Sequence, residues 1–142
     1  MNNLTIRNVR ILDTTADGIN FHKGVTNSVV ENSFIRNTGD DGLAMWADKY
    51  PEVNNKFIRN TVALPILGNN IAIYGGRDIE VSDNLVYDTV TNGGGILVAN
   101  RFENVRGESG VKGNYKIFRN TMLRAGASDD NWRFGVGAIW FR

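Results

Sequence analysis

The sequence predicts an all-β protein, a right-handed parallel β-helix of about five coils. A short segment ending in asparagine recurs at intervals of about 24 residues, and a second short apolar segment follows each copy. No apolar pattern with the 3.6-residue period of a helix continues over three turns. A repeat of this length, with two or three short strands and no helix, is typical of one β-helix coil.

The first strand of each unit is marked by its terminal asparagine. The five segments are Asn3–Asn8, Asn27–Asn32, Asn55–Asn60, Ile79–Asn84 and Tyr115–Asn120, with intervals of 24, 28, 24 and 36 residues between the final asparagines. Coils of a β-helix stack at about 4.8 Å, so equivalent positions form ladders. We therefore predict one asparagine ladder, in which each residue adopts the left-handed turn conformation and bonds to the amide of the next coil.

A second strand follows in each unit, at Gly18–Phe21, Gly42–Met45, Asn70–Ile73, Gly95–Val98 and Gly137–Trp140. Its inward-facing apolar side chains would be covered by the next coil. The predicted coils span roughly residues 3–26, 27–54, 55–77, 78–113 and 114–142 of a single domain, 1–142. A leucine-rich repeat would need leucines at fixed offsets, and a propeller blade would be nearer 40 residues.

Both ends of the chain fall within strand patterns, and a β-helix needs caps at its ends. This predicts a fragment without end caps, a monomer that is part of a larger multidomain chain. Insertions at 100–113 and 126–134 interrupt the last two units. Such loops on a solenoid commonly project from one face and shape its binding site.

Composition restricts the partners. The chain is 42% hydrophobic and 22% charged with a formal net charge of +1, which is a globular composition that gives no support to a nucleic-acid or membrane partner. There are no cysteines, so disulfides and thiolate metal sites are excluded. No apolar run approaches the roughly 20 residues of a membrane span, and no signal peptide is visible.

The run Thr38–Gly42 carries the most informative side chains. Ile19 aligns with Leu43 one coil on, so Asp17 aligns with Asp41, and Asp40 lies beside them. Stacked like charges repel, so a purely structural ladder would not use them. Glycoside hydrolysis needs such a set, in which one acid protonates the leaving oxygen and carboxylates activate water. Spacing suggests Asp40 as acid and Asp17 with Asp41 as base; an Asp- and Gly-rich turn or a calcium site are the alternatives.

The segments Ala16–Ile19 and Thr38–Trp46 resemble the catalytic core of the α-1,3-glucanase and mycodextranase family, glycoside hydrolase family 87. The resemblance implies a secreted, endo-acting, inverting enzyme that hydrolyses α-1,3-glucosidic bonds of α-glucan on a β-helix. It also implies catalysis by three aspartates, which match Asp17, Asp40 and Asp41. No cofactor would be required, and no catalytic metal is expected, although a structural Ca²⁺ is compatible with the residues.

The residues leave three other functions open. A polygalacturonase-like hydrolase would show Gly-His-Gly and Arg-Ile-Lys motifs, but Gly68, Asn69 and Asn70 occupy the next coil. A polysaccharide lyase would use an arginine base with calcium. A non-catalytic calcium-binding segment of a β-helix adhesin or tailspike would use the aspartates as ligands.

Several residues near the aspartates are candidates for substrate binding. The aromatic rings can stack on sugar faces, and the amides and the imidazole can bond to hydroxyl groups. Each also has a structural interpretation, as a packing, turn or surface residue. Arg77 and Arg101 are further candidates that the sequence does not decide. The predicted substrate-binding residues are Asn20, His22, Trp46, Asn69, Tyr74 and Trp132.

Overall fold

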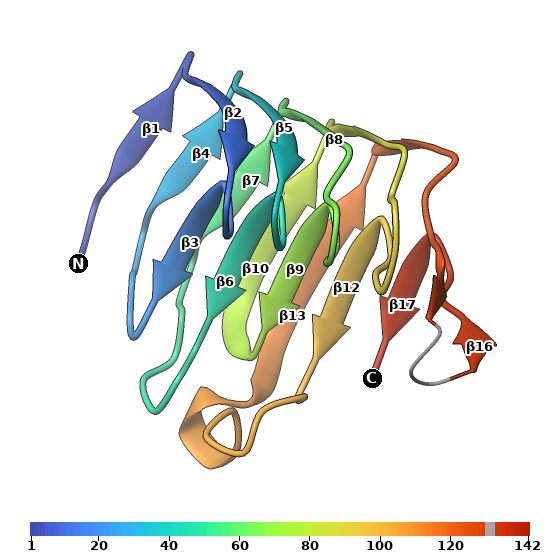
Figure 1. Ribbon diagram of the computed structural model, residues 1–142. Helices are drawn as coiled ribbons and strands as arrows, with labels where there is room; N and C mark the ends of the chain where they lie inside the picture. The colour runs from blue at the N-terminus through green and yellow to red at the C-terminus, as the bar shows by residue number, and fades with distance from the viewer. Residues whose placement is uncertain (130–132) are drawn as a thin grey trace.

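A computed structural model describes residues 1–129 and 133–142, and it confirms the predicted right-handed parallel β-helix. Each coil contributes one strand to each of three parallel sheets, which run side by side along the axis (Figure 1). Sheet A consists of β1 (Thr5–Arg7), β4 (Val29–Glu31), β7 (Lys56–Ile58), β10 (Gly76–Ser82) and β13 (Val111–Phe118).

The other two sheets have the same order. Sheet B consists of β2 (Arg10–Thr14), β5 (Phe34–Thr38), β8 (Thr61–Ala63), β11 (Leu85–Tyr87) and β14 (Thr121–Leu123). Sheet C consists of β3 (Ile19–His22), β6 (Leu43–Trp46), β9 (Ile71–Tyr74), β12 (Ile96–Ala99) and β17 (Ile139–Phe141).

The insertions add little regular structure. The first contains a 3₁₀ turn (Gly107–Ser109), and the second contains the antiparallel pair β15 (Ser128–Asp129) and β16 (Phe134–Gly135). The loop between β12 and β13 projects beyond the strand ends (Figure 1). Among the described residues, no helix is long and apolar enough to cross a membrane.

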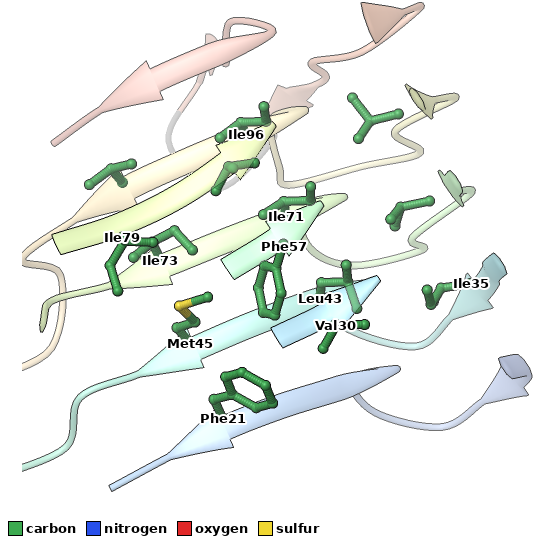
Figure 2. Packing of buried hydrophobic residues seen from close by; sticks show 14 of the residues in the cluster. Phe21, Val30, Ile35, Leu43, Met45, Phe57, Ile71, Ile73, Ile79 and Ile96 are labelled. Carbon is green, nitrogen blue, oxygen red and sulfur yellow. The ribbon is translucent and has the colours of Figure 1, made fainter. Parts of the chain in front are cut away.

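The core lies in the space that the three sheets enclose. Every second side chain of a strand points inward, and parallel pairing places equivalent residues above one another. In sheet C, Leu43, Ile71 and Ile96 form one such apolar ladder and are fully buried. Figure 2 shows this stacking. The stacked apolar rows fix the register of the turns between the sheets, where the polar residues lie.

The prediction of a single asparagine ladder is wrong, because the later asparagines lie one residue after the position that the earlier ones occupy in the coil. Asn8 and Asn32 occupy a left-handed corner (φ 57° and 50°), and the next coil places Arg59 there (φ 55°). Asn60 and Asn84 follow that corner and point inward, where Asn84 Oδ1 accepts a hydrogen bond from the backbone N–H of Asn60 at 2.9 Å. Strand β7 pairs with β4 at an offset of 27 residues, but Asn32 and Asn60 are 28 residues apart in the sequence. Asparagine therefore serves two adjacent positions for different reasons.

Candidate active site

The three predicted aspartates come together in the turns that lead from sheet B to sheet C. Ile19 pairs with Leu43 and Leu43 with Ile71, so Asp17, Asp41 and Asn69 occupy one position in three successive coils, and the predicted alignment of Asp17 with Asp41 is confirmed. The backbone N–H of Gly18 donates to Asp41 O at 3.0 Å across the first of these steps. One carboxylate oxygen from each of Asp17, Asp40 and Asp41 lies within 4.8 Å of the others.

Asp41 is the most enclosed of the three, with 3% of its surface exposed. Its Oδ1 accepts hydrogen bonds from Asn69 N (2.6 Å) and Asn69 Nδ2 (2.7 Å), and its Oδ2 accepts one from the Tyr74 hydroxyl (3.0 Å). Burial raises the pKa of Asp41 to about 7; the Asn69 bonds oppose this rise, and the charges of Asp40 and Asp17 add to it. A carboxyl group with a pKa near 7 can exchange protons at neutral pH.

Asp17 and Asp40 are more accessible. Asp17 is half-buried, and burial raises its pKa, although the Asn20 Nδ2 donor at 2.6 Å favours the charged form. Asp40 is exposed, and its Oδ1 accepts a hydrogen bond from the backbone N–H of Asp41 at 2.8 Å. The three carboxylates therefore differ in environment, which is how neighbouring acids acquire different roles.

Gly68 leaves the space that the carboxylates need. A Cβ atom at this position would lie 2.7 Å from Asp40 Oδ1 and 2.8 Å from both the N and Oδ1 atoms of Asp41. These separations are shorter than Cβ contacts allow. The coil after Asp41 therefore needs glycine beneath the acidic pair.

The carboxylates open into a cleft of about 410 Å³. This volume is within the range of ligand sites. One wall is aromatic, and the lining combines apolar rings with a few polar groups. The lining residues are Asp17, Asn20, Asp40, Asp41, Trp46, Leu67, Gly68, Asn69, Tyr74, Asn92, Arg101 and Phe102.

The predicted binding residues divide into two groups. Asn20, Trp46, Asn69 and Tyr74 line the cleft, whereas the lining does not include His22. The His22 ring instead stacks on Trp46, with centroids 4.6 Å apart and planes at 14°.

Asn69 and Tyr74 line the cleft, but the protein itself engages their polar atoms. The Asn69 amide is occupied by Asp41 and by the backbone N–H of Gly94, which donates to Asn69 Oδ1 at 2.8 Å. Tyr74 is 6% exposed and also bonds to Asp41. Trp132 lies outside the described residues.

The sequence did not identify Leu67, Asn92 or Phe102 as part of the cleft, and it left Arg101 undecided. Phe102 contacts two predicted residues, because its ring centroid lies 5.2 Å from that of Trp46 and 4.8 Å from that of Tyr74. Its position at the start of the predicted insertion is the only signal that could have indicated it. Leu67 and Asn92 carry no motif, and only the stacking of coils brings them to the site.

Comparisons with known proteins identify the family of the chain. The family described as "Alpha-1,3-glucanase catalytic domain D2" matches residues 1–129. A comparison with curated protein sequences gave no match.

Solved structures resemble the chain over nearly its whole length. The catalytic unit of a thermostable glycoside hydrolase family 87 α-1,3-glucanase from Streptomyces thermodiastaticus is 41% identical over 99% of this chain and 26% of that chain, with a TM-score of 0.92. The Agl-KA catalytic domain is 37% identical over 99% of this chain and 24% of that one, with a TM-score of 0.85. The chain thus spans about a quarter of these structures.

A third similar structure contains sugar. It is the catalytic domain of a family 87 α-1,3-glucanase with one aspartate replaced by alanine, in complex with tetrasaccharides. That protein is 30% identical over 96% of this chain and 26% of its own length, with a TM-score of 0.81.

Proposed function

Because the chain belongs to the α-1,3-glucanase catalytic domain D2 family of glycoside hydrolase family 87, we propose that it supplies the catalytic carboxylates of an enzyme that hydrolyses α-1,3-glucosidic bonds in α-glucan. The observation that carries this proposal is the meeting of three carboxylates at the base of a cleft. We further propose that the enzyme acts outside the cell, because a polymeric glucan is too large to enter it, and that it cleaves bonds inside the glucan chain.

We assign the roles as the sequence suggested. Asp40 donates a proton to the leaving oxygen, because it is offset from the stacked pair of Asp17 and Asp41 and its exposed side chain can reach the leaving group. Asp17 and Asp41 hold the attacking water between them, because they are stacked one coil apart and held by fixed donors. Two oxygens within 4.8 Å of each other can share one hydrogen-bonded water.

The proposed stereochemistry is inversion. Carboxyl groups of inverting enzymes are commonly about 6.5–9.5 Å apart and those of retaining enzymes about 5–5.5 Å, so the short separation here does not by itself favour inversion. However, an attacking water about 3–3.5 Å from the anomeric carbon lies only roughly 5 Å from the leaving oxygen on its other side. Carboxylates that reach both oxygens from one protein surface can therefore lie this close together.

The experiment replaces each aspartate by asparagine in the full-length protein, with Asp13→Asn as the matched control. Asp13 lies on an exposed corner in a left-handed conformation that asparagine also accepts. We expect each of Asp17→Asn, Asp40→Asn and Asp41→Asn to lower reducing-sugar release about 10²–10⁴-fold. The control should retain full activity. Retained activity in the three site variants would refute the proposal.

Two further measurements resolve the details. Proton NMR of the first products distinguishes the mechanisms, since inversion of an α-linkage releases the β-anomer. A substrate with a good leaving group needs no acid, so it should restore turnover to Asp40→Asn but not to Asp17→Asn or Asp41→Asn. Equal restoration in all three variants would contradict the role of Asp40.

A calcium-binding, non-catalytic segment is the second candidate. Oxygens up to 4.8 Å apart could also share one Ca²⁺, which binds oxygen at about 2.3–2.6 Å. Under this alternative, a chelator would lower the thermal unfolding temperature markedly and no glucan would be cleaved. We expect the opposite result, with turnover that persists in EDTA.

A further inference from the structure

Tyr74 belongs to a closed set of hydrogen bonds around Asp41. Its hydroxyl donates to Asp41 Oδ2 at 3.0 Å and accepts from Asn69 Nδ2 at 3.3 Å. Asn69 also donates to the other oxygen of Asp41 through its backbone and its side chain. Both oxygens of Asp41 are thus held by fixed donors, and Tyr74 is the donor to Oδ2.

The Tyr74 ring would be accessible without the loop that covers it. It alternates with the inward-facing Ile73 on β9, so it lies on the outer face of sheet C, yet it is 6% exposed. Phe102 meets its ring at a centroid distance of 4.8 Å and an angle of 67°. Val105 of the same loop is fully buried in the cluster that contains Tyr74.

The loop is attached to the body of the helix at a second point. The backbone N–H of Lys49 donates to Asn104 O at 3.3 Å, and the Ser109 hydroxyl donates to Asn104 O at 2.7 Å. Residues 100–110 therefore form a packed cover, with Phe102 over the tyrosine.

We propose that Tyr74 is a positioning residue, which orients Asp41 through its hydroxyl, and that the loop of residues 100–110 keeps Tyr74 in place through Phe102. This inference rests on the proposed function, and it differs from the substrate contact that the sequence suggested for Tyr74. Burial and the charge of Asp41 raise the pKa of the Tyr74 phenol, so it remains a donor throughout the neutral range.

The first test replaces Tyr74 by phenylalanine, which keeps the ring and removes the hydroxyl. Loss of one hydrogen bond to a charged group should lower kcat about 10–100-fold. KM should stay within about twofold, because the hydroxyl already donates to Asp41 and accepts from Asn69. The matched control is Tyr50→Phe, the same change on a tyrosine that is 62% exposed and does not line the cleft.

The second test examines the loop. Phe102→Leu leaves the hydroxyl present but loosens the ring, so we expect a smaller fall in kcat, roughly threefold to tenfold. When Phe102→Leu is added to Tyr74→Phe, kcat should fall by less than about twofold beyond its value in Tyr74→Phe alone, because both substitutions act through the hydrogen bond from Tyr74 to Asp41. If the fold-loss in kcat of the double variant equals the product of the losses of the two single variants, the proposed role of Phe102 would be overturned.

The outcomes separate this inference from the proposed function. Suppose that the unaltered protein cleaves α-1,3-glucan and that Tyr74→Phe has a normal kcat or changes only KM. That result would overturn the inference about Tyr74 and leave the proposed function standing. An inactive unaltered protein would refute the function. Crystal structures of the unaltered and Tyr74→Phe proteins then decide the inference, because an unchanged orientation of the Asp41 carboxylate would overturn it.

Discussion

Replacing Gly68 by alanine should displace the carboxylates of Asp40 and Asp41 without altering either residue. The added Cβ atom would lie 2.7 Å from Asp40 Oδ1 and 2.8 Å from the backbone N of Asp41. The Asp40 side chain can rotate away, but a backbone atom between stacked coils cannot. We therefore expect the turn that holds Asp41 to move.

The size of the effect follows from these separations. Ordinary contacts begin at 3.4 Å, so the atoms around the new methyl group must retreat by about 0.6–0.7 Å. A misplacement of about 1 Å can cost 10²-fold in rate, so we expect kcat to fall roughly 10–100-fold. Overpacking of this kind costs about 1–3 kcal/mol of the free energy of unfolding.

The assay compares initial rates on α-1,3-glucan and thermal unfolding for Gly68→Ala and for Gly135→Ala. Apart from its chain neighbours, no described residue has an atom within 4 Å of the position of an added Cβ at Gly135, so its variant should match the unaltered protein in both measurements. A Gly68→Ala protein that is folded and retains more than half of its activity would refute the argument that this glycine sets the carboxylate geometry.

Three further predictions concern the ladders, a buried acid and the cleft wall. Asn84→Ala removes four side-chain hydrogen bonds and should lower the free energy of unfolding by roughly 2–4 kcal/mol. Asn8→Ala, at an exposed left-handed corner, should lower it by only about 1 kcal/mol. Equal losses of the two variants in urea titrations would contradict the assignment of the asparagines to two separate ladders. Burial raises the pKa of Glu52 to about 7, so the folded state binds this proton more tightly than the unfolded state does. Glu52 therefore contributes most to the free energy of unfolding below about pH 4.5, and up to about 3 kcal/mol of this contribution is lost as the pH rises to about 7. The fall in unfolding free energy between pH 5 and 7.5 should be shallower in Glu52→Gln, and an unchanged slope would count against this pKa. Trp46→Ala should raise KM about tenfold because the indole lines the cleft, and His22→Ala should change KM less than threefold; a larger effect of His22 would restore it as a substrate contact.

The fold and the carboxylate cluster could be predicted because both depend on a regular interval. Parallel coils pair residue by residue, so the 24-residue interval that aligns Ile19 with Leu43 also aligns Asp17 with Asp41. Where an interval is irregular, the prediction failed. The 28-residue step from Asn32 to Asn60 predicts one ladder, but the strands pair at an offset of 27 residues.

Sequence patterns alone predict the coil, the register of sheet C and the three aspartates at the start of two adjacent strands, because these patterns repeat along the chain. Which of the three carboxylates is enclosed depends instead on how the coils and loops pack together. Burial of Asp41 depends on Asn69 and Tyr74 from the next coil, and on a loop that begins near Phe102, a coil further on. Desolvation is a property of everything that surrounds a group, and no spacing between residues encodes it.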